Sequence, residues 1–342
     1  MIRQGKTDKP GDCRLAVVVA VALPNARTER CLRACAALTY EPRAIVVVSD
    51  EPLAVPDDSH FVNIVTGAGR MTSPAEKRDL AAARLRDVDA YVYLDDDAYP
   101  PVDWLDRVAA TLHENPDAAG VGGPGLMPDD QSFWERVSAA VTEARLGSGP
   151  LRFRFWRERA RDCDDFPAYD LAIRKSALDA AGGWATDWYG GEDTDLCGRL
   201  ADAGGLIRYE PAASVFHYRR VLVPKHFWQI QNVGRSRGCF IRAGYGRSRQ
   251  WTFAGPPLAV IAAAAIASLP FWPGIDREAA WIVLAALYLG IAAFAHPGRI
   301  GLGVRAVLPL AIVVHHLAYA VGLIRGVLTG ERRSHPAGPS ST

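Results

Sequence analysis

The sequence has no excess of charge of either sign. Its 342 residues carry 39 Lys and Arg against 38 Asp and Glu, a net charge of +1, and arginine far outnumbers lysine without forming one long basic run. A basic patch or stripe is the usual electrostatic mark of a nucleic-acid-binding protein. The balanced charge therefore argues against nucleic acid as a partner.

The chain also lacks the cysteine patterns of metal and redox sites. Its six cysteines form no CxxC pair and no Cys/His zinc spacing, and the separation of Cys31 and Cys35 is poor evidence for either a metal site or a disulfide. We expect reduced, partly buried thiols, as in cytosolic proteins. Residues 1–12 are polar and contain no apolar signal-peptide core, so we expect the first domain to remain in the cytoplasm.

Apolar, β-branched runs alternate with helical patterns in the first part of the chain. Runs this short and continuous are typical of strands buried on both faces. The expected strands are residues 15–21, 44–48, 61–65 and 90–94, with helices at 28–38 and 74–85. This β-α-β-β-α-β order predicts an α/β fold with a mostly parallel sheet and covering helices. Further helices are expected at 103–113, 132–146, 174–181 and 194–203, and a strand at 171–173.

Two acidic clusters carry most of the functional signal. Asp95–Asp97 ends the expected strand 90–94, and Glu192 with Asp193 lies in a glycine-rich turn before a helix. The carboxyl end of a buried strand is where an open α/β sheet binds its ligands, and hard oxygen ligands suit Mg²⁺ or Mn²⁺. A carboxylate outside this context is a candidate general base. Together the clusters predict metal-assisted transfer from a nucleotide-activated donor.

Beyond Gln250 the chain becomes strongly apolar. Two of its three apolar stretches fall slightly short of the about 20 residues that span a bilayer, and the alternative is buried helices of a soluble domain. Three in succession, with short polar joints, favour two to three transmembrane helices. The expected organisation is a flexible N-terminus (1–14), a catalytic domain (15–250), a membrane region (251–326, with apolar stretches 256–272, 279–295 and 306–324) and a polar tail (327–342).

Arginines flank the apolar stretches unevenly. Arg242 precedes the first, and Arg299 and Arg305 lie between the second and third, which places both regions in the cytoplasm by the positive-inside rule. We therefore expect a multi-pass protein of the cell (inner) membrane with a cytoplasmic catalytic domain. Arg325 and the arginines of the tail argue against a tail outside the cell, so the third stretch either spans or re-enters.

The ordered motifs give the chain a family resemblance over roughly residues 15–237. They are Pro74-Ala75-Glu76-Lys77-Arg78-Asp79, Leu94-Asp95-Asp96-Asp97-Ala98, Gly182-Gly183-Trp184 and Gly191-Glu192-Asp193-Thr194-Asp195-Leu196. In this order the chain resembles family 2 of the inverting glycosyltransferases, whose GT-A fold is a Rossmann-like mixed sheet that binds nucleotide-diphospho-sugars. It departs from the family at Ser49-Asp50, where two Asp are usual, so only Asp50 is carried over.

The resemblance implies a role for each residue of the donor site. Asp97 would be the main ligand of Mg²⁺ or Mn²⁺, with Asp95 sharing the metal or binding the ribose, and His217 on the metal or the diphosphate. The residues expected around the nucleotide are Asp50, Lys77, Arg78, Asp95 and Asp96. Simpler alternatives are solvated loop carboxylates, a turn-forming Asp50 and a structural His217.

The resemblance also implies an acceptor site. Asp193 would be the general base, because a hydroxyl is a poor nucleophile until its proton is removed. Glu192 would orient Asp193 or bind the acceptor, and Trp184 and Trp188 would stack on sugar rings. The alternatives are helix capping by the two carboxylates and core packing by the two tryptophans.

These observations favour a metal-dependent inverting glycosyltransferase that works at membrane lipids and transfers sugar from a nucleotide donor to a hydroxyl of a lipid-linked or membrane-proximal glycan. A polyprenyl-phosphate glycosyl transferase is the alternative enzyme, but its anionic acceptor needs no base, and Glu192-Asp193 favours the hydroxyl. A non-catalytic membrane-anchored scaffold that binds nucleotide sugar is the alternative from another class. The run 231–237 loosely resembles the Gln/Arg motif of processive synthases but lacks its Trp, so processivity is not predicted.

Overall fold

The computed structural model describes residues 13–184, 188, 190–244 and 251–330, and these form two compact units. The first contains the described residues of Met1–Leu126 and Trp156–His217, and the second those of Met127–Phe155 and Tyr218–Arg332. Segment 127–155, which lies inside the expected catalytic domain, is thus grouped with the C-terminal helices.

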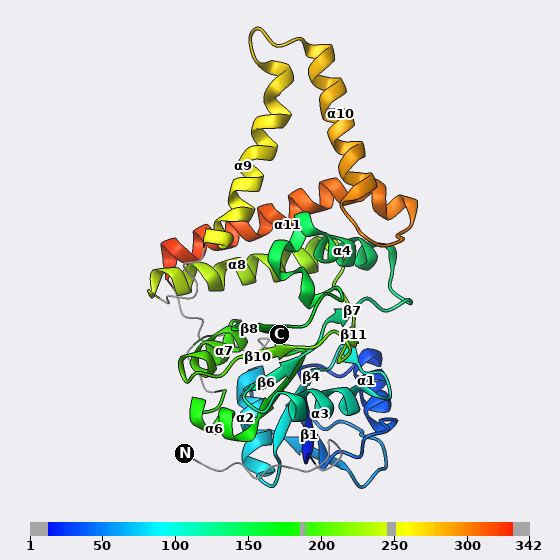
Figure 1. Ribbon diagram of the computed structural model, residues 1–342, viewed down its shortest axis with the longest axis vertical. Helices are drawn as coiled ribbons and strands as arrows, with labels where there is room; N and C mark the ends of the chain where they lie inside the picture. Colours follow the sequence, from blue (N-terminus) through cyan, green and yellow to red (C-terminus); the bar gives the residue numbers. More distant parts are fainter. Residues whose placement is uncertain (1–12, 185–187, 189, 245–250, 331–342) are drawn as a thin grey trace. The chain divides into compact units, whose positions relative to one another are not determined.

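An eight-stranded sheet with the order β3-β2-β1-β4-β9-β6-β10-β8 forms the centre of the first unit (Figure 1). Strands β1 to β4 are mutually parallel where they pair, whereas β9 is antiparallel to both β4 and β6, so the sheet is mixed. The expected α/β fold is confirmed. The strands are Leu15–Val21 (β1), Ala44–Ser49 (β2), Phe61–Val65 (β3), Ala90–Asp95 (β4), Gly120–Gly122 (β6), Arg161–Cys163 (β8), Asp170–Arg174 (β9) and Ile207–Tyr209 (β10).

Helices cover both faces of this sheet. Side chains alternate along a strand, and one face of β1, β2 and β4 packs with residues of α1 (Ala26–Ala36) and α3 (Trp104–Glu114) in a single apolar core. On the other face Tyr91 donates hydrogen bonds from its hydroxyl to the carbonyls of Ala82 and Leu85, in and after α2 (Pro74–Arg84). Ser73 and Glu76 form a capping box that begins α2, with proline at its first position.

Two further parts of the first unit lie next to the acidic motifs of the sequence: a pair of helices and a small second sheet. Helices α6 (Lys175–Ala181) and α7 (Glu192–Asp202) follow β9. A small sheet of order β5-β11-β7 joins Ala98–Tyr99 (β5), Val215–His217 (β11) and Gly125–Leu126 (β7). Because His217 pairs with Ala98 in this sheet, it lies beside the acidic end of β4 despite their distance in the sequence.

The second unit is helical. Val137 and Val141 of α4 pack against Leu308 and Ile312 of α11 in a small apolar core. Beside it, buried Glu143 meets His296 Nε2 at 2.8 Å. The longer helices of the unit are Phe133–Glu143 (α4), Phe227–Arg242 (α8), Gly255–Ser268 (α9), Arg277–Phe294 (α10) and Leu302–Thr329 (α11), and the short helix α5 is Arg145–Ser148.

Helices α8 and α11 lie in backbone contact. Gly234 and Gly238 of α8 face Gly322 and Gly326 of α11, and a Cβ added at any of the four would lie 2.0–2.3 Å from a carbonyl oxygen of the opposite helix. Each helix thus presents a G-x-x-x-G pattern to the other, the spacing that lets two helix backbones approach closely. Only glycine fits at these positions.

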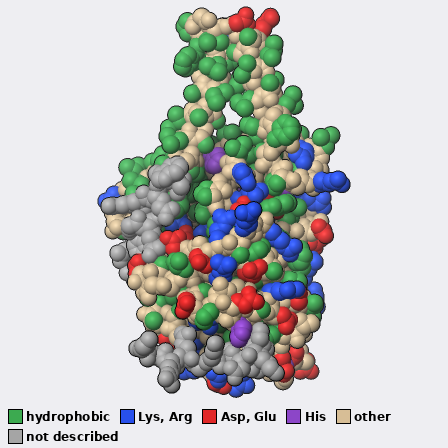
Figure 2. All heavy atoms as spheres, viewed as in Figure 1, with side chains coloured by type: hydrophobic (Ala, Val, Ile, Leu, Met, Phe, Trp, Pro, Cys, Tyr) green, Lys and Arg blue, Asp and Glu red, His purple; other side chains and the backbone are tan. Residues whose placement is uncertain are grey.

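Helices α9 and α10 form a hairpin whose arms project away from α11 (Figure 1). Apolar side chains cover both arms, and acidic side chains appear at the tip (Figure 2). By length and hydropathy, α10 and α11 could each cross a membrane, while α9 is shorter. Only 11% of the apolar window of α10 is buried within the protein, against 56% for α11.

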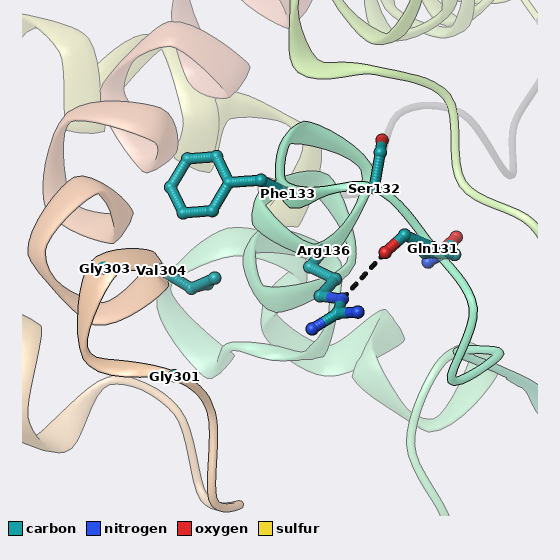
Figure 3. Close-up of a pocket in the computed structure, with 7 residues that line it drawn as sticks. All are labelled: Gln131, Ser132, Phe133, Arg136, Gly301, Gly303 and Val304. Carbon is teal, nitrogen blue, oxygen red and sulfur yellow. Dashed lines mark hydrogen bonds between the residues drawn. The ribbon is translucent and has the colours of Figure 1, made fainter.

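A cavity of about 590 Å³ lies where α4 and α11 begin (Figure 3). Phe133 reaches from α4 toward α11, where Val304 lines the opposite side, and Arg136 donates from Nε to the carbonyl of Gln131. Its lining is mainly apolar, with one guanidinium. It belongs entirely to the second unit and contains none of the expected catalytic residues.

Candidate active site

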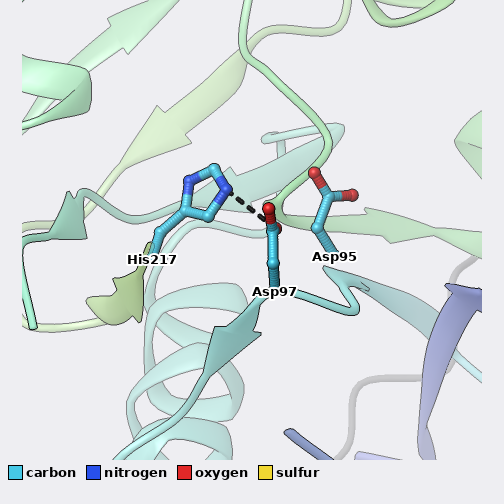
Figure 4. A group of neighbouring side chains, drawn as sticks. All are labelled: Asp95, Asp97 and His217. Atoms are coloured by element: carbon cyan, nitrogen blue, oxygen red, sulfur yellow. Dashed lines mark hydrogen bonds and ion pairs between the residues drawn. The ribbon is translucent and has the colours of Figure 1, made fainter. Parts of the chain in front are cut away.

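Asp95, Asp97 and His217 come together at the carboxyl end of β4 (Figure 4). One potential ligand atom from each lies within 4.8 Å of the other two, and His217 Nε2 is 3.0 Å from Asp97 Oδ1. Two carboxylates and one imidazole, partly open to solvent, form a donor set that suits Mg²⁺ or Mn²⁺. The residues expected at the metal therefore lie in one place and fit such an ion.

Negative charge in this cluster is poorly compensated. Partial burial raises the pKa of Asp95, and the Asp97 carboxylate adds to the rise, against the effect of Arg78. Burial and the carboxylates of Asp97 and Asp95 raise the pKa of Asp96 to about 7, although Thr28 lies within hydrogen-bonding reach. Such shifts mean that deprotonating the whole cluster is unfavourable without a cation.

Arg78 joins this cluster to the second acidic motif. Its side chain is only 6% exposed, and one guanidinium nitrogen is 3.2 Å from Asp95 Oδ1 while the other is 3.5 Å from Glu192 Oε1. The guanidinium also lies 4.6 Å from the ring centre of Trp184. A single buried cation thus contacts the end of β4 and the beginning of α7.

The second motif begins α7. Glu192 accepts hydrogen bonds from the backbone N–H groups of Gly190 and Gly191, and Asp193 accepts one from Thr194. Burial raises the pKa of Asp193 to about 7, with further contributions from Glu192 and Asp165. A carboxylate with a pKa near neutrality is suited to general-base catalysis. The sequence predicted this pair, but not the nearby Asp165.

Asp50 and Lys77 are paired with each other. Lys77 Nζ lies 2.6 Å from Asp50 and is buried, and Thr66 and Thr72 also donate to this carboxylate. Burial by itself would raise the pKa of Asp50, but these hydrogen bonds lower it on balance. Lys77 therefore points to Asp50 and not toward the carboxylates of β4.

The two tryptophans expected at the acceptor lie in different surroundings. Trp184 is fully buried, with its ring edge-on to Tyr93 at 4.8 Å and its backbone N–H donating to Asp79. It supports Arg78 from the core and offers no face to an acceptor, which corrects that expectation. Trp188 is half-buried, and its neighbour Tyr189 lies outside the described residues.

Asp165 is the residue of this site that the sequence analysis missed. It accepts a hydrogen bond from the Thr194 hydroxyl at 3.1 Å and lies close enough to raise the pKa of Asp193. The signal available in the sequence was the acidic pair Asp164-Asp165, but neither an apolar strand-like run nor a glycine turn adjoins it in the sequence.

Comparison with known proteins places this chain in a family. Residues 91–324, more than half of the chain, match the family model for glycosyl transferase family group 2. The succinoglycan biosynthesis protein ExoA of Rhizobium meliloti (strain 1021) is 27% identical over 246 residues, which cover 68% of each chain.

Two further similarities are narrower. The pre-mycofactocin glycosyltransferase of Mycobacterium tuberculosis is 44% identical over 54 residues, which span only 16% of this chain and 12% of that protein. The mannosyltransferase PcManGT from Pyrobaculum calidifontis, solved with GDP-Man and Mn²⁺, superposes with a TM-score of 0.60 at 17% identity, covering 94% of this chain and 91% of that one. The present chain and this mannosyltransferase share the GT-A fold. The protein therefore belongs to glycosyl transferase family group 2 and is a glycosyltransferase.

Proposed function

We propose that this glycosyltransferase is metal-dependent and inverting, and that it transfers a sugar from a nucleoside-diphosphate donor to a hydroxyl of a lipid-linked or membrane-proximal glycan. The observation that carries the proposal is the double contact of Arg78 with Asp95 and Glu192. The guanidinium of Arg78 therefore lies between the cluster suited to bind a metal and diphosphate and the acidic pair suited to remove a proton.

The donor half of the site consists of Asp95, Asp97 and His217. These three residues would hold the divalent cation, which when bound neutralises charge that develops on the diphosphate leaving group. The presence of Mn²⁺ and GDP-Man in the complex of the structurally similar mannosyltransferase supports this assignment. Asp50 with Lys77, and Asp96, would border the nucleotide.

The acceptor half is the turn at Glu192 and Asp193. Asp193 accepts the proton of the acceptor hydroxyl while the hydroxyl oxygen forms a bond to the anomeric carbon. The bond from that carbon to the diphosphate oxygen breaks, and the nucleoside diphosphate leaves with the electron pair. Because attack and departure occur on opposite faces, the anomeric configuration inverts. Glu192 holds the turn through its backbone hydrogen bonds, and Trp188 would border the acceptor.

Three observations support a glycan acceptor near a membrane. The raised pKa of Asp193, about 7, suits the deprotonation of a hydroxyl, whereas a phosphate acceptor needs no base. The exposed apolar arms of α9 and α10 favour membrane association, with the catalytic unit on the cytoplasmic side. The relative named for succinoglycan biosynthesis also favours a glycan product.

The first experiment measures nucleotide release from a panel of nucleotide sugars by detergent-purified protein with Mn²⁺ or Mg²⁺. The wild type should release nucleoside diphosphate from one donor, and EDTA should abolish the release. If no donor turns over with any divalent ion, the metal-dependent transfer proposed here is wrong.

A second comparison uses Asp193→Asn with two acceptors. Transfer to a glycan hydroxyl should fall by about 10²- to 10⁴-fold, the contribution typical of a general base, while donor binding is unchanged. Full activity of Asp193→Asn with a polyprenyl phosphate would instead identify the lipid phosphate as acceptor and remove the need for a base.

A further inference from the structure

The long apolar helix α11 has two different faces. One face, with Leu308, Ala311 and Ala318, is buried within the second unit. The opposite face is exposed and also apolar. Its members follow one another at spacings of three, four and seven residues, as expected for one stripe of a helix. They are Leu310, Val313, Leu317, Ile324 and Leu328, each 38–71% exposed. We refer to these five residues as the α11 stripe.

Polar helices cover the buried face along its length. Near its C-terminal end, Gly322 and Gly326 contact the backbone of α8 at Gln231, Arg235 and Cys239. Further toward the N-terminus, His315 pairs with His226 at 3.0 Å and His316 bonds to the carbonyl of Leu146 at 2.7 Å.

If α11 crossed a bilayer, these partners would enter it too. Helix α8 contains Gln231, Asn232, Arg235 and Arg237, and α4 contains Glu135 and Glu143. Charged groups are costly in the hydrocarbon core, so the packing of α11 is incompatible with a transmembrane position.

The hairpin of α9 and α10 has the opposite properties. No residue of α9 is buried and only Ala280 of α10 is, and neither arm carries a charge between its ends. The 18 residues of α10 give a length of about 27 Å, close to the thickness of a hydrocarbon core. Asp276 caps α10 and Glu278 lies in its first turn, and Figure 2 shows acidic side chains at this tip. The exposed Trp272 and Trp281 flank it, as expected for tryptophans at a membrane surface.

We propose that the protein enters the membrane through the α9–α10 hairpin alone, and that α11 lies in the plane of the bilayer surface with its stripe toward the lipid. The occupant of the stripe is therefore the lipid bilayer. Arginines stand at both ends of α11, Arg299 just before it, Arg305 in its first turn and Arg325 in its last turns, which keeps both ends on the cytoplasmic side.

The cavity beside Phe133 and Val304 fits this arrangement. It lies at the beginning of α11, where Leu302 is 83% exposed, and its lining is mainly apolar and includes Arg136 (Figure 3), which suits the acyl chain and phosphate of a lipid. The whole inference rests on the membrane anchoring in the proposed function, but not on the reaction.

The first test is cysteine labelling of the full chain, expressed in bacterial cells in a Cys163→Ser background, since the other five native cysteines are buried. An impermeant maleimide should label Ile275→Cys, at the hairpin tip, in intact cells. It should label Thr329→Cys, at the end of α11, only in inverted vesicles, like the control Arg299→Cys. Labelling of Thr329→Cys in intact cells would show that α11 crosses, and failure to label Ile275→Cys there would show that the hairpin does not.

A depth measurement gives an independent test. A fluorophore is attached to one cysteine at a time, in Leu310→Cys, Leu317→Cys and Ile324→Cys. Quenching of its fluorescence by lipids brominated at two depths in the vesicles then reports the depth of each position. The outer two positions lie about 21 Å apart along a helix, yet an in-plane α11 gives all three the same shallow depth. A spanning α11 would make Leu317 the deepest. Absence of quenching together with disulfide-linked dimers through Leu317→Cys would assign the stripe to a second copy of the chain.

A separate experiment tests whether the protein is anchored in the membrane at all. A protein that is washed from membranes by carbonate lacks the anchor on which this inference rests. Nucleotide release by the same preparation reports the glycosyl transfer independently, so loss of one proposal leaves the other testable.

Discussion

Both units of the protein bury charged side chains, but they compensate that charge differently. In the helical unit Glu143 meets His296, and Glu135 accepts two hydrogen bonds from Ser132 in a capping box. In the α/β unit Asp95 and Asp96 lie near Asp97, and Asp193 lies near Glu192. The pKa values of Asp95, Asp96 and Asp193 are raised. Buried charge that the protein pairs internally serves the fold. Carboxylates whose pKa values are raised in this way are candidates for binding a ligand of opposite charge.

The largest effect on activity is expected when one carboxylate of the cluster at the end of β4 is removed. Asp97→Ala should lower nucleotide release by about 10³-fold or more, because the proposed metal would supply several kcal/mol of charge stabilisation in the transition state. Its melting temperature should stay the same or rise, since a repulsive charge is removed.

Thermal unfolding with added Mn²⁺ checks this prediction. The ion should raise the melting temperature of the wild type and leave that of Asp97→Ala unchanged, because only the wild type binds it in the folded state. Asp57→Ala, at an exposed carboxylate of the same unit, is the matched control and should behave as the wild type. A marked loss of stability in Asp97→Ala would mean that this carboxylate is structural.

The next effect concerns pH. Because the pKa of Asp193 is raised to about 7, the proposed base would be protonated and inactive below that pH. The value of kcat/KM should therefore fall about tenfold per pH unit below 7 and level off above it. Profiles of wild type and Asp193→Asn at saturating metal check this. A wild-type profile that stays flat down to pH 5 would contradict the assignment.

Removing a buried charge partner in the helical unit should lower the free energy of unfolding and leave the rate of glycosyl transfer unchanged. His296→Leu removes the partner of Glu143 and leaves a buried carboxylate alone, which costs about 1–3 kcal/mol or more. Denaturant unfolding should show this loss, while turnover per folded molecule stays the same. His113→Gln, at an exposed histidine, is the control. Unchanged stability in His296→Leu would mean that Glu143 finds another partner.

The smallest expected effect is a difference in stability between alanine substitutions at two glycines of the helical unit. Gly322→Ala places a Cβ 2.0 Å from the carbonyl oxygen of Gln231, so the two helices must separate, at a cost of about 1–3 kcal/mol. Gly290→Ala in α10 meets nothing within 4 Å and should be neutral or stabilising by up to about 1 kcal/mol. The ranking of the two melting temperatures is the measurement. Equal values would contradict the close contact of α8 and α11.

The sequence analysis predicted the elements of the α/β unit well, because local pattern determines them. The continuous apolar runs at 15–21 and 90–94 became β1 and β4, and α2 began at Pro74, where the helix 74–85 was expected. Helix α7 began at Glu192, slightly before the expected 194, since no side-chain cap marks its first residue. The long expected helix 132–146 is α4 followed by the short α5.

Other features depend on contacts between distant parts of the chain. Nothing local distinguishes Trp184, which is buried under Arg78, from Trp188, which is half-exposed. In the same way, α10 and α11 both have apolar sequences, but only α11 is covered by α4 and α8.

The sequence by itself determined which side chains stand at the ends of strands and turns, and hence where Asp95–Asp97 and Glu192-Asp193 enter the fold. Hydrophobic periodicity and capping act over a few residues, so they can be read along the chain. Only the tertiary structure decided that Arg78 contacts both acidic motifs, that His217 completes the cluster, and that α11 is packed against polar helices. Those contacts join residues far apart in the sequence, and they arise from the packing of whole elements, which no local pattern specifies.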